Sequence, residues 1–344
     1  MFRRSRIPII AALALALVVA AGATAFASAP AQGQSGEVIV SGSSTVEPIT
    51  SLVGEKFSEK NPDVAVRVDG PGTGDGFQLF CNGETDISDA SRAIEEEEQQ
   101  ACQANGIAYT ELKVGIDGLS VITSKDTKGV SCLNLNDLYA LIGPQSQGFD
   151  NWQDAQPLAT QLGSTTKLPR AKLEITAPGE ESGTYDSFVE LALGDPAEKQ
   201  VEAGAITEDQ AETTRKDYQS SANDNTIIDG VAETKNSLGW VGFAFADQNK
   251  DKVKIVKVDK GEGDGCVAPS AKTVRDGSYP LSRDLYIYVN NAKAASNPAV
   301  KSFVDYYMGK NGNASVKEAD YIQLAKADWT QSVDTWKATA QSLG

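Results

Sequence analysis

Short apolar runs at strand spacing alternate along this chain with apolar residues at helical spacing. Residues 37–40 and 64–68 have the pattern of strands, and between them Ile49, Val53 and Phe57 recur four positions apart, as on one face of a helix. The same order of strand, turn and helix then repeats. Strands that alternate with helices are typical of a parallel sheet covered by helices. The pattern therefore predicts an α/β fold.

Two apolar stretches predict where the chain passes between two domains. Residues 112–123 are long enough to leave one domain and enter the next, and residues 285–289 are expected to return the chain. We therefore expect lobe I to contain residues 36–115 and 285–344, and lobe II residues 116–284. Two connecting strands of this kind form a hinge. Other expected elements are helices at 48–59, 95–105, 135–141, 187–193, 227–234 and much of 299–344, and strands at 172–176 and 238–244.

The first 27 residues have the pattern of a secretory signal. Arg3, Arg4 and Arg6 precede an apolar run over residues 9–19, and an Ala-Phe-Ala site ends at Ala27. Residues 28–35 are expected to be a flexible leader. The alternative is an uncleaved membrane anchor, because the apolar segment is nearly long enough to span a bilayer. Either way, we expect an exported protein, periplasmic or at the cell surface, and tethered to the membrane if the signal stays.

Charge and composition exclude several classes of function. The formal net charge is −16, and it becomes −19 without the signal, which carries three arginines and no acids. Such a chain should bind neither nucleic acid nor an anionic membrane. The chain has no histidine, which removes Ser-His-Asp and Cys-His catalysis and the usual zinc sites. The sequence indicates no cofactor and no metal site.

The four cysteines, Cys81, Cys102, Cys132 and Cys266, are an even number in a chain expected to be exported. Two disulfides are therefore expected, although three pairings are open and free thiols remain the alternative. Cys81 with Cys102 would enclose a loop the size of a helix. Cys132 with Cys266 would join the start and the end of the middle region.

Three turns rich in glycine and hydroxyl groups precede predicted helices, at residues 42–45, 70–76 and 182–184. The first turn of a helix has unpaired N–H groups, which can hold an anion together with nearby hydroxyls. Each turn alone could be an ordinary helix cap. Their repetition predicts an oxyanion pocket to which all three contribute.

Motifs of known enzymes are absent or incomplete. Ser182 lies outside a Gly-x-Ser-x-Gly elbow, and the Ser-x-x-Lys match at residues 164–167 is followed by Pro169, where that chemistry needs a helix. The glycine-rich turn at 70–76 fits neither the nucleotide P-loop nor the dinucleotide motif. The acidic run at 95–98 is typical of a solvated helix start.

These turns, in this order and with Asp86-Ile87-Ser88-Asp89-Ala90-Ser91-Arg92 between them, resemble the periplasmic phosphate-binding proteins of phosphate ABC transporters (PstS type). The resemblance implies a two-lobe clamshell, each lobe a mixed, mainly parallel sheet flanked by helices. It also implies a non-enzymatic, monomeric receptor that captures inorganic phosphate and delivers it to membrane permease subunits. A secreted phosphatase, or a receptor for another oxyanion such as sulfate or molybdate, is the alternative. The ligand positions that the resemblance implies are Ser44, Thr45, Val46, Thr73, Gly74, Ser182, Gly183 and Thr184.

Two positions depart from many relatives of this family. Their ligand arginine would fall at Pro178 here, and Arg92, after Ser91 in the Ala-Ser-Arg branch of the family, is expected to replace it. If Arg92 does not bind the anion, Arg67 and Arg283 come next. The carboxylate that accepts the phosphate proton and excludes sulfate is open. The candidates are Asp75, which we favour, Glu181 and Asp224.

Overall fold

The computed structural model describes residues 35–180, 182–261 and 265–343. The predicted signal, all but the last residue of the predicted leader, and Glu181 lie outside the described residues. Within the described part, no helix combines the length and the apolar character needed to cross a bilayer.

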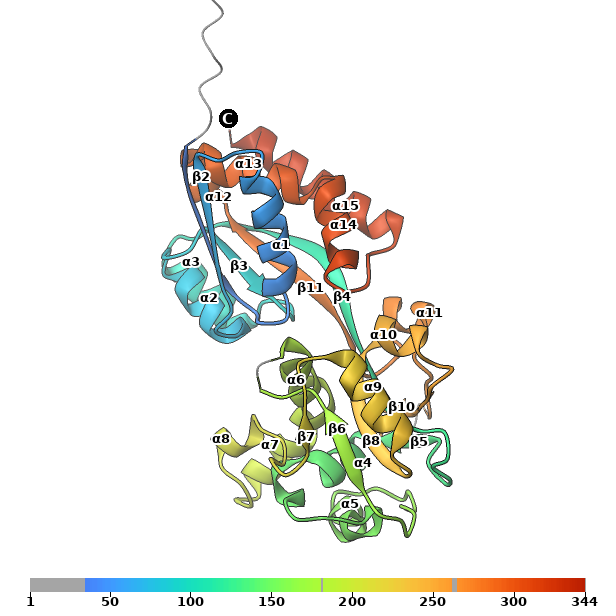
Figure 1. The fold of residues 1–344 in the computed structure, drawn as a ribbon. Coiled ribbons are helices and arrows are strands. Elements are labelled where there is room, and N and C mark those ends of the chain that lie inside the picture. Colours follow the sequence, from blue (N-terminus) through green and yellow to red (C-terminus); the bar gives the residue numbers. More distant parts are fainter. Residues whose placement is uncertain (1–34, 181, 262–264, 344) are drawn as a thin grey trace, which may run out of the picture. The chain divides into compact units, whose positions relative to one another are not determined.

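Most strands belong to one mixed sheet (Figure 1). Its order is β2 (Val64–Asp69), β1 (Gly36–Gly42), β3 (Ile87–Ala90), β11 (Ser282–Asn290), β4 (Tyr109–Ser124), β8 (Ser237–Gly242), β6 (Glu174–Ala177) and β7 (Gln219–Ser220). In addition, β9 (Val253–Ile255) pairs with β4, and β10 (Lys257–Asp259) pairs with β5 (Cys132–Asn134). The parallel pairs of the large sheet lie toward its two ends, and the antiparallel pairs surround β4 and β11. The predicted α/β class is confirmed.

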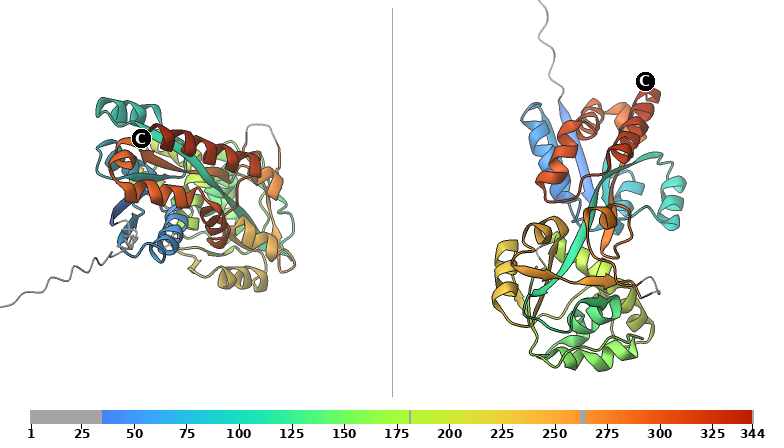
Figure 2. Two further views of the ribbon diagram at one scale, coloured as in Figure 1. Left: turned by 90° about the horizontal axis from the view of Figure 1, so that it is seen from above. Right: turned by 90° about the vertical axis from the view of Figure 1, so that its right-hand side faces the viewer.

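Strand β4 connects the two halves of this sheet. Its first part pairs with β11 over Tyr109–Gly118, and its second part pairs with β8 over Leu119–Thr123. Figures 1 and 2 show β4 and β11 running together from the elements around α1 to those around α9. The two predicted connecting stretches are therefore the strands that link the lobes, whereas the exact lobe boundaries stay a prediction.

Helices pack on the sheet in both lobes. In the first lobe they are α1 (Glu47–Ser58), α2 (Thr73–Cys81), α3 (Glu96–Ala104), α12 (Asn291–Ser296), α13 (Pro298–Tyr307), α14 (Lys310–Glu318) and α15 (Lys326–Ser342). In the second they are α4 (Leu135–Ile142), α5 (Gln156–Gln161), α6 (Gly183–Phe188), α7 (Gly194–Glu202), α8 (Glu208–Ala211), α9 (Asp224–Glu233), α10 (Phe243–Gln248) and α11 (Ala271–Arg275). Short 3-10 turns cover Pro144–Ser146 and Trp152–Ala155.

Several predicted boundaries were wrong, among them the start of the helix expected over 227–234, which begins at Asp224. The strand expected over residues 238–244 ends at Gly242, because the chain turns there into α10. The helix expected over 187–193 begins earlier, at Gly183, where Ser182 caps it. It then widens into a π-helix over Val189–Leu193 before α7.

Each lobe has its own apolar core. In the first, Phe57 of α1 packs edge to face on Phe303 of α13, with ring centroids 5.4 Å apart. In the second, Phe188 of α6 stacks on Trp240 of β8 at 4.1 Å. Burial of such aromatic surface is a main source of stability. It fixes α6, and hence the turn that precedes it, on the sheet.

Both predicted disulfides form. Cys81 at the end of α2 is bonded to Cys102 of α3, and Cys132 of β5 is bonded to Cys266. The second bridge closes 134 residues of chain, so it constrains almost the whole of the second lobe.

Candidate functional site

The first two predicted turns lie side by side at the ends of β1 and β2. The backbone N–H of Gly72 donates to the carbonyl of Gly42 at 2.9 Å. A Cβ on Gly76 would lie 2.3 Å from the Cα of Gly42, so only glycine allows this approach. The glycines of the second turn thus place α2 directly against the first turn.

Thr73 and Ser91 form a buried hydroxyl pair beside these turns. Their Oγ atoms are 3.0 Å apart, and the N–H of Ser91 donates to Oγ1 of Thr73 at 3.2 Å. Gly74 and Asp75 lie next to Thr73 in the first turn of α2 but are exposed. The structure thus brings the second turn together with the end of β3.

The third turn reaches across from the second lobe to the first turn. Oγ of Ser44 donates to Oδ2 of Asp186 at 2.6 Å, and Oγ1 of Thr45 lies 3.1 Å from Oγ of Ser187. A Cβ on Gly183 would lie 3.1 Å from the carbonyl oxygen of Ser44. Glycine therefore lets the backbone before α6 approach the first turn closely.

Arg283 of β11 lies where these two turns meet. Its Nη2 donates to Oγ1 of Thr45 and to Oγ of Ser187, both at 3.0 Å. Its Nη1 pairs with Glu190, and its Nε lies 3.5 Å from Oδ2 of Asp117. Only 11% of the side chain is exposed. One arginine on a connecting strand therefore contacts hydroxyls from both lobes.

From the sequence, Arg283 was named only as an alternative to Arg92, together with Arg67. The signal that points to Arg283 is its position, two residues before the strand predicted to return the chain between the lobes. A side chain at a hinge is close to both lobes. From the sequence, this closeness can be inferred only through the predicted connecting strands.

Arg92, the first choice, lies beside the Thr73 and Ser91 pair but is committed to acids of its own lobe. Its Nη1 and Nη2 donate to the two carboxylate oxygens of Glu98, both at 2.8 Å, and its Nε lies 3.1 Å from Glu95. The hydrogen bonds that Arg92 donates to Glu98 are the main reason that the pKa of Arg92 is raised. The structure does not bring Arg92 into contact with Arg283.

The candidate proton acceptors lie in different settings. Asp75 is exposed, and Asp224 is partly buried beside the third turn. Asp117, which sequence reasoning did not consider, is buried, and its Oδ2 has no hydrogen-bond partner among the described residues. Burial raises the pKa of Asp117, and the charge of Arg283 opposes this rise.

A cavity of about 230 Å³ opens beside the third turn. Its lining includes Ser182, Gly183 and Thr184, with Asp117, Asp224 and Tyr321 around them. Asp320, also in the lining, has a left-handed backbone with φ of 65°, a conformation that costs energy outside glycine and occurs often at functional sites. The described residues hold no cluster of acids, cysteines or histidines suited to a metal ion.

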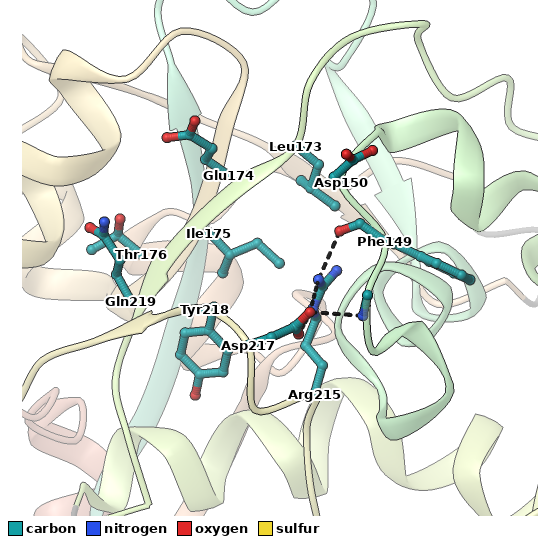
Figure 3. Close-up of a pocket in the computed structure, with 11 residues that line it drawn as sticks. Phe149, Asp150, Leu173, Glu174, Ile175, Thr176, Arg215, Asp217, Tyr218 and Gln219 are labelled. Atoms are coloured by element: carbon teal, nitrogen blue, oxygen red, sulfur yellow. Dashed lines mark hydrogen bonds and ion pairs between the residues drawn. The ribbon is translucent and has the colours of Figure 1, made fainter.

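A larger cavity, of about 490 Å³, lies entirely within the second lobe (Figure 3). Arg215 is buried there, but its Nε and Nη2 bind the carboxylate of Asp217, and its Nη2 also donates to the carbonyl of Phe149. Asp217 in turn accepts from the N–H of Gly148 at 2.7 Å. These contacts tie two loops together, so we assign Arg215 a structural role.

Asp89, near the first turn, is a buried acid whose protonation affects the stability of the fold. Its carboxylate is fully buried, with Oδ1 accepting from Thr50 at 3.0 Å and Oδ2 unpartnered among the described residues. Burial raises the pKa of Asp89 to about 8. The folded state therefore holds this proton more tightly than the unfolded chain, so stability is lost as the pH rises from about 4 toward 8.

Asp89→Asn should therefore raise the free energy of unfolding at pH 9 by about 2–4 kcal/mol, and the gain should shrink as the pH falls toward 4. Urea unfolding at several pH values measures this. Exposed Asp75→Asn is the control and should change little. An equal gain at both ends of the pH range would mean that Asp89 is not held protonated.

Comparison with known proteins gives a consistent set of relatives. Residues 24–311 match the PBP superfamily domain. The chain is 35% identical to the protein SphX of Synechocystis sp. over 84% of this chain and 79% of that protein. It is 34% identical to the phosphate-binding protein PstS of Staphylococcus saprophyticus over 86% and 83%. A crystal structure described as a possible phosphate binding protein from Planctomyces limnophilus superposes with a TM-score of 0.79, at 32% identity, covering 89% of this chain and 99% of that one.

Proposed function

From the premise that this chain belongs to the PstS family within the PBP superfamily, we propose that it captures inorganic phosphate between its two lobes and delivers it to an ABC permease. The observation that carries this proposal is the convergence of Arg283 with the hydroxyls of Thr45 and Ser187, which come from different lobes. A guanidinium and several hydroxyls are suited to the four oxygens of phosphate.

The proposed site combines residues from both lobes with the connecting strand. The first lobe supplies hydroxyls and N–H groups of its two turns, and the second supplies the turn before α6. Arg283 completes the set from β11. The full proposed set is Ser44, Thr45, Val46, Thr73, Gly74, Ser91, Arg92, Asp117, Ser182, Gly183, Thr184, Ser187 and Arg283.

The cellular setting follows from the same family. We propose an exported monomer that acts outside the cytoplasm, as a periplasmic or cell-surface receptor, and that catalyses no reaction. If the segment before residue 28 is not cleaved, it tethers the receptor to the membrane.

A panel of titrations tests this function. Isothermal titration of phosphate into ligand-stripped protein lacking residues 1–27 should give a heat signal that saturates at one phosphate per chain. Sulfate and molybdate should bind much more weakly. The proposal fails if phosphate gives no signal, or if sulfate binds as tightly. It also fails if metal-supplemented protein hydrolyses a chromogenic phosphate ester, which would favour a phosphatase.

Selectivity against sulfate should depend on Asp117. Phosphate keeps a proton at neutral pH and sulfate has none, so a buried acceptor facing the anion favours phosphate. Asp117→Asn should lower the ratio of phosphate to sulfate affinity by about tenfold or more, mainly because sulfate gains a donor. Titration of both anions into the variant measures the ratio.

The matched control is Asp75→Asn, which removes the acid favoured by the sequence. Because Asp75 is exposed, its replacement should leave the ratio unchanged. If Asp75→Asn collapses the ratio and Asp117→Asn does not, the sequence-based choice was correct and our structural choice is wrong.

A further inference from the structure

Glu190 lies beside the proposed site without belonging to any of its turns. It is the second residue of the π-helix Val189–Leu193, which follows directly on α6. A π-helix adds a residue to the turn and so shifts the face on which the following side chains lie; such turns are frequent at functional sites. The carboxylate of Glu190 pairs with Nη1 of Arg283.

Glu190 binds Nη1 of Arg283, a nitrogen that the two hydroxyls do not contact. Nη2 is already hydrogen-bonded to Thr45 and Ser187, so Nη1 is the donor at which Glu190 is bound. A carboxylate and a phosphate oxygen are equivalent partners for a guanidinium N–H. Nη1 carries two N–H groups, but a carboxylate and a phosphate at the same nitrogen repel each other, so the phosphate is held best when the carboxylate leaves.

The charge of Glu190 acts on groups at or beside the proposed site. Its charge contributes, after stronger local causes, to the raised pKa of Arg92 and of Asp186. Arg92, Asp186 and Arg283 come from β3's end, α6 and β11, so Glu190 faces groups from both lobes.

The carboxylate of Glu190 can leave Arg283 at little energetic cost. Half of its side chain, 51%, is exposed, whereas Arg283 is 11% exposed. A half-exposed carboxylate loses little by returning to water, because surface ion pairs are weak. The buried arginine, in contrast, needs a partner whenever the carboxylate departs.

We propose that Glu190 is an internal competitor of phosphate: its carboxylate occupies Nη1 of Arg283 in the empty receptor and must be displaced by the entering anion. This inference rests on the proposed function. It makes Glu190 a determinant of affinity that weakens binding rather than a ligand that strengthens it.

The test compares phosphate titrations of wild type, Glu190→Gln and Glu198→Gln at one ionic strength. Glu198 is an exposed acid on α7, so its replacement changes the net charge equally without touching Arg283. Glu190→Gln should bind phosphate about tenfold more tightly than wild type, with Glu198→Gln near wild type. Glu190→Asp, which shortens the carboxylate and keeps the charge, should lie between them and serves if the first variant is unfolded.

The outcomes separate the two claims. If wild type binds phosphate and both Glu190 variants bind no more tightly than Glu198→Gln, Glu190 is no competitor and the inference is overturned while the function stands. If wild type and all variants fail to bind phosphate, the proposed function is wrong and the inference falls with it.

Discussion

Replacing Arg283 with alanine should weaken phosphate binding at least about a hundredfold, because a buried charge-assisted donor shared by both lobes is lost. The same change removes the bridge between Thr45 and Ser187. Isothermal titration with phosphate measures the loss. Exposed Arg275→Ala, with the same change in net charge, should bind like wild type.

Arg92→Ala tests the choice made from the sequence. Since Arg92 is held by Glu98 and Glu95, its removal should weaken binding less than that of Arg283. If Arg92→Ala abolishes binding and Arg283→Ala does not, Arg92 must leave Glu98 to bind the anion, and the sequence-based assignment is right.

Removing the Cys132–Cys266 bridge should lower the free energy of unfolding by about 5 kcal/mol, since the bridge restricts a long loop in the unfolded chain. The variant is Cys132→Ser with Cys266→Ser, and urea unfolding under oxidising conditions measures the change. Much of the marginal stability of a typical protein would be lost.

The other bridge provides the comparison. Cys81→Ser with Cys102→Ser opens a loop of only 21 residues, so its loss should cost about 3 kcal/mol. An equal or larger loss for this pair would show that native packing around the bridges, rather than loop length, decides their contribution.

Local patterns made much of the fold predictable. The glycine and hydroxyl turns and the connecting strands follow from spacing along short stretches. The even cysteine count predicted two disulfides but left three pairings open. Gly42 and Gly76 stand where backbones must approach closely, so their role could be anticipated from their type alone.

The centre of the site was harder to predict because it depends on contacts between distant residues. Arg283 meets Thr45 across 238 positions of sequence, and no periodicity reports such a pairing. Asp117 lies within an apolar strand, where its burial depends on how the lobes pack. The apolar spacing over residues 188–193 predicted a helix, but it did not distinguish an α-helix from the π-helix that carries Glu190.

The most direct test of the central claim is the position of the bound anion in a crystal structure grown with arsenate, a phosphate analogue whose anomalous signal locates it. Our account predicts a peak between the lobes, within hydrogen-bonding distance of Arg283 and Thr45, with Glu190 displaced. A peak beside Arg215 in the second lobe, or no peak between the lobes at saturating arsenate, would contradict it.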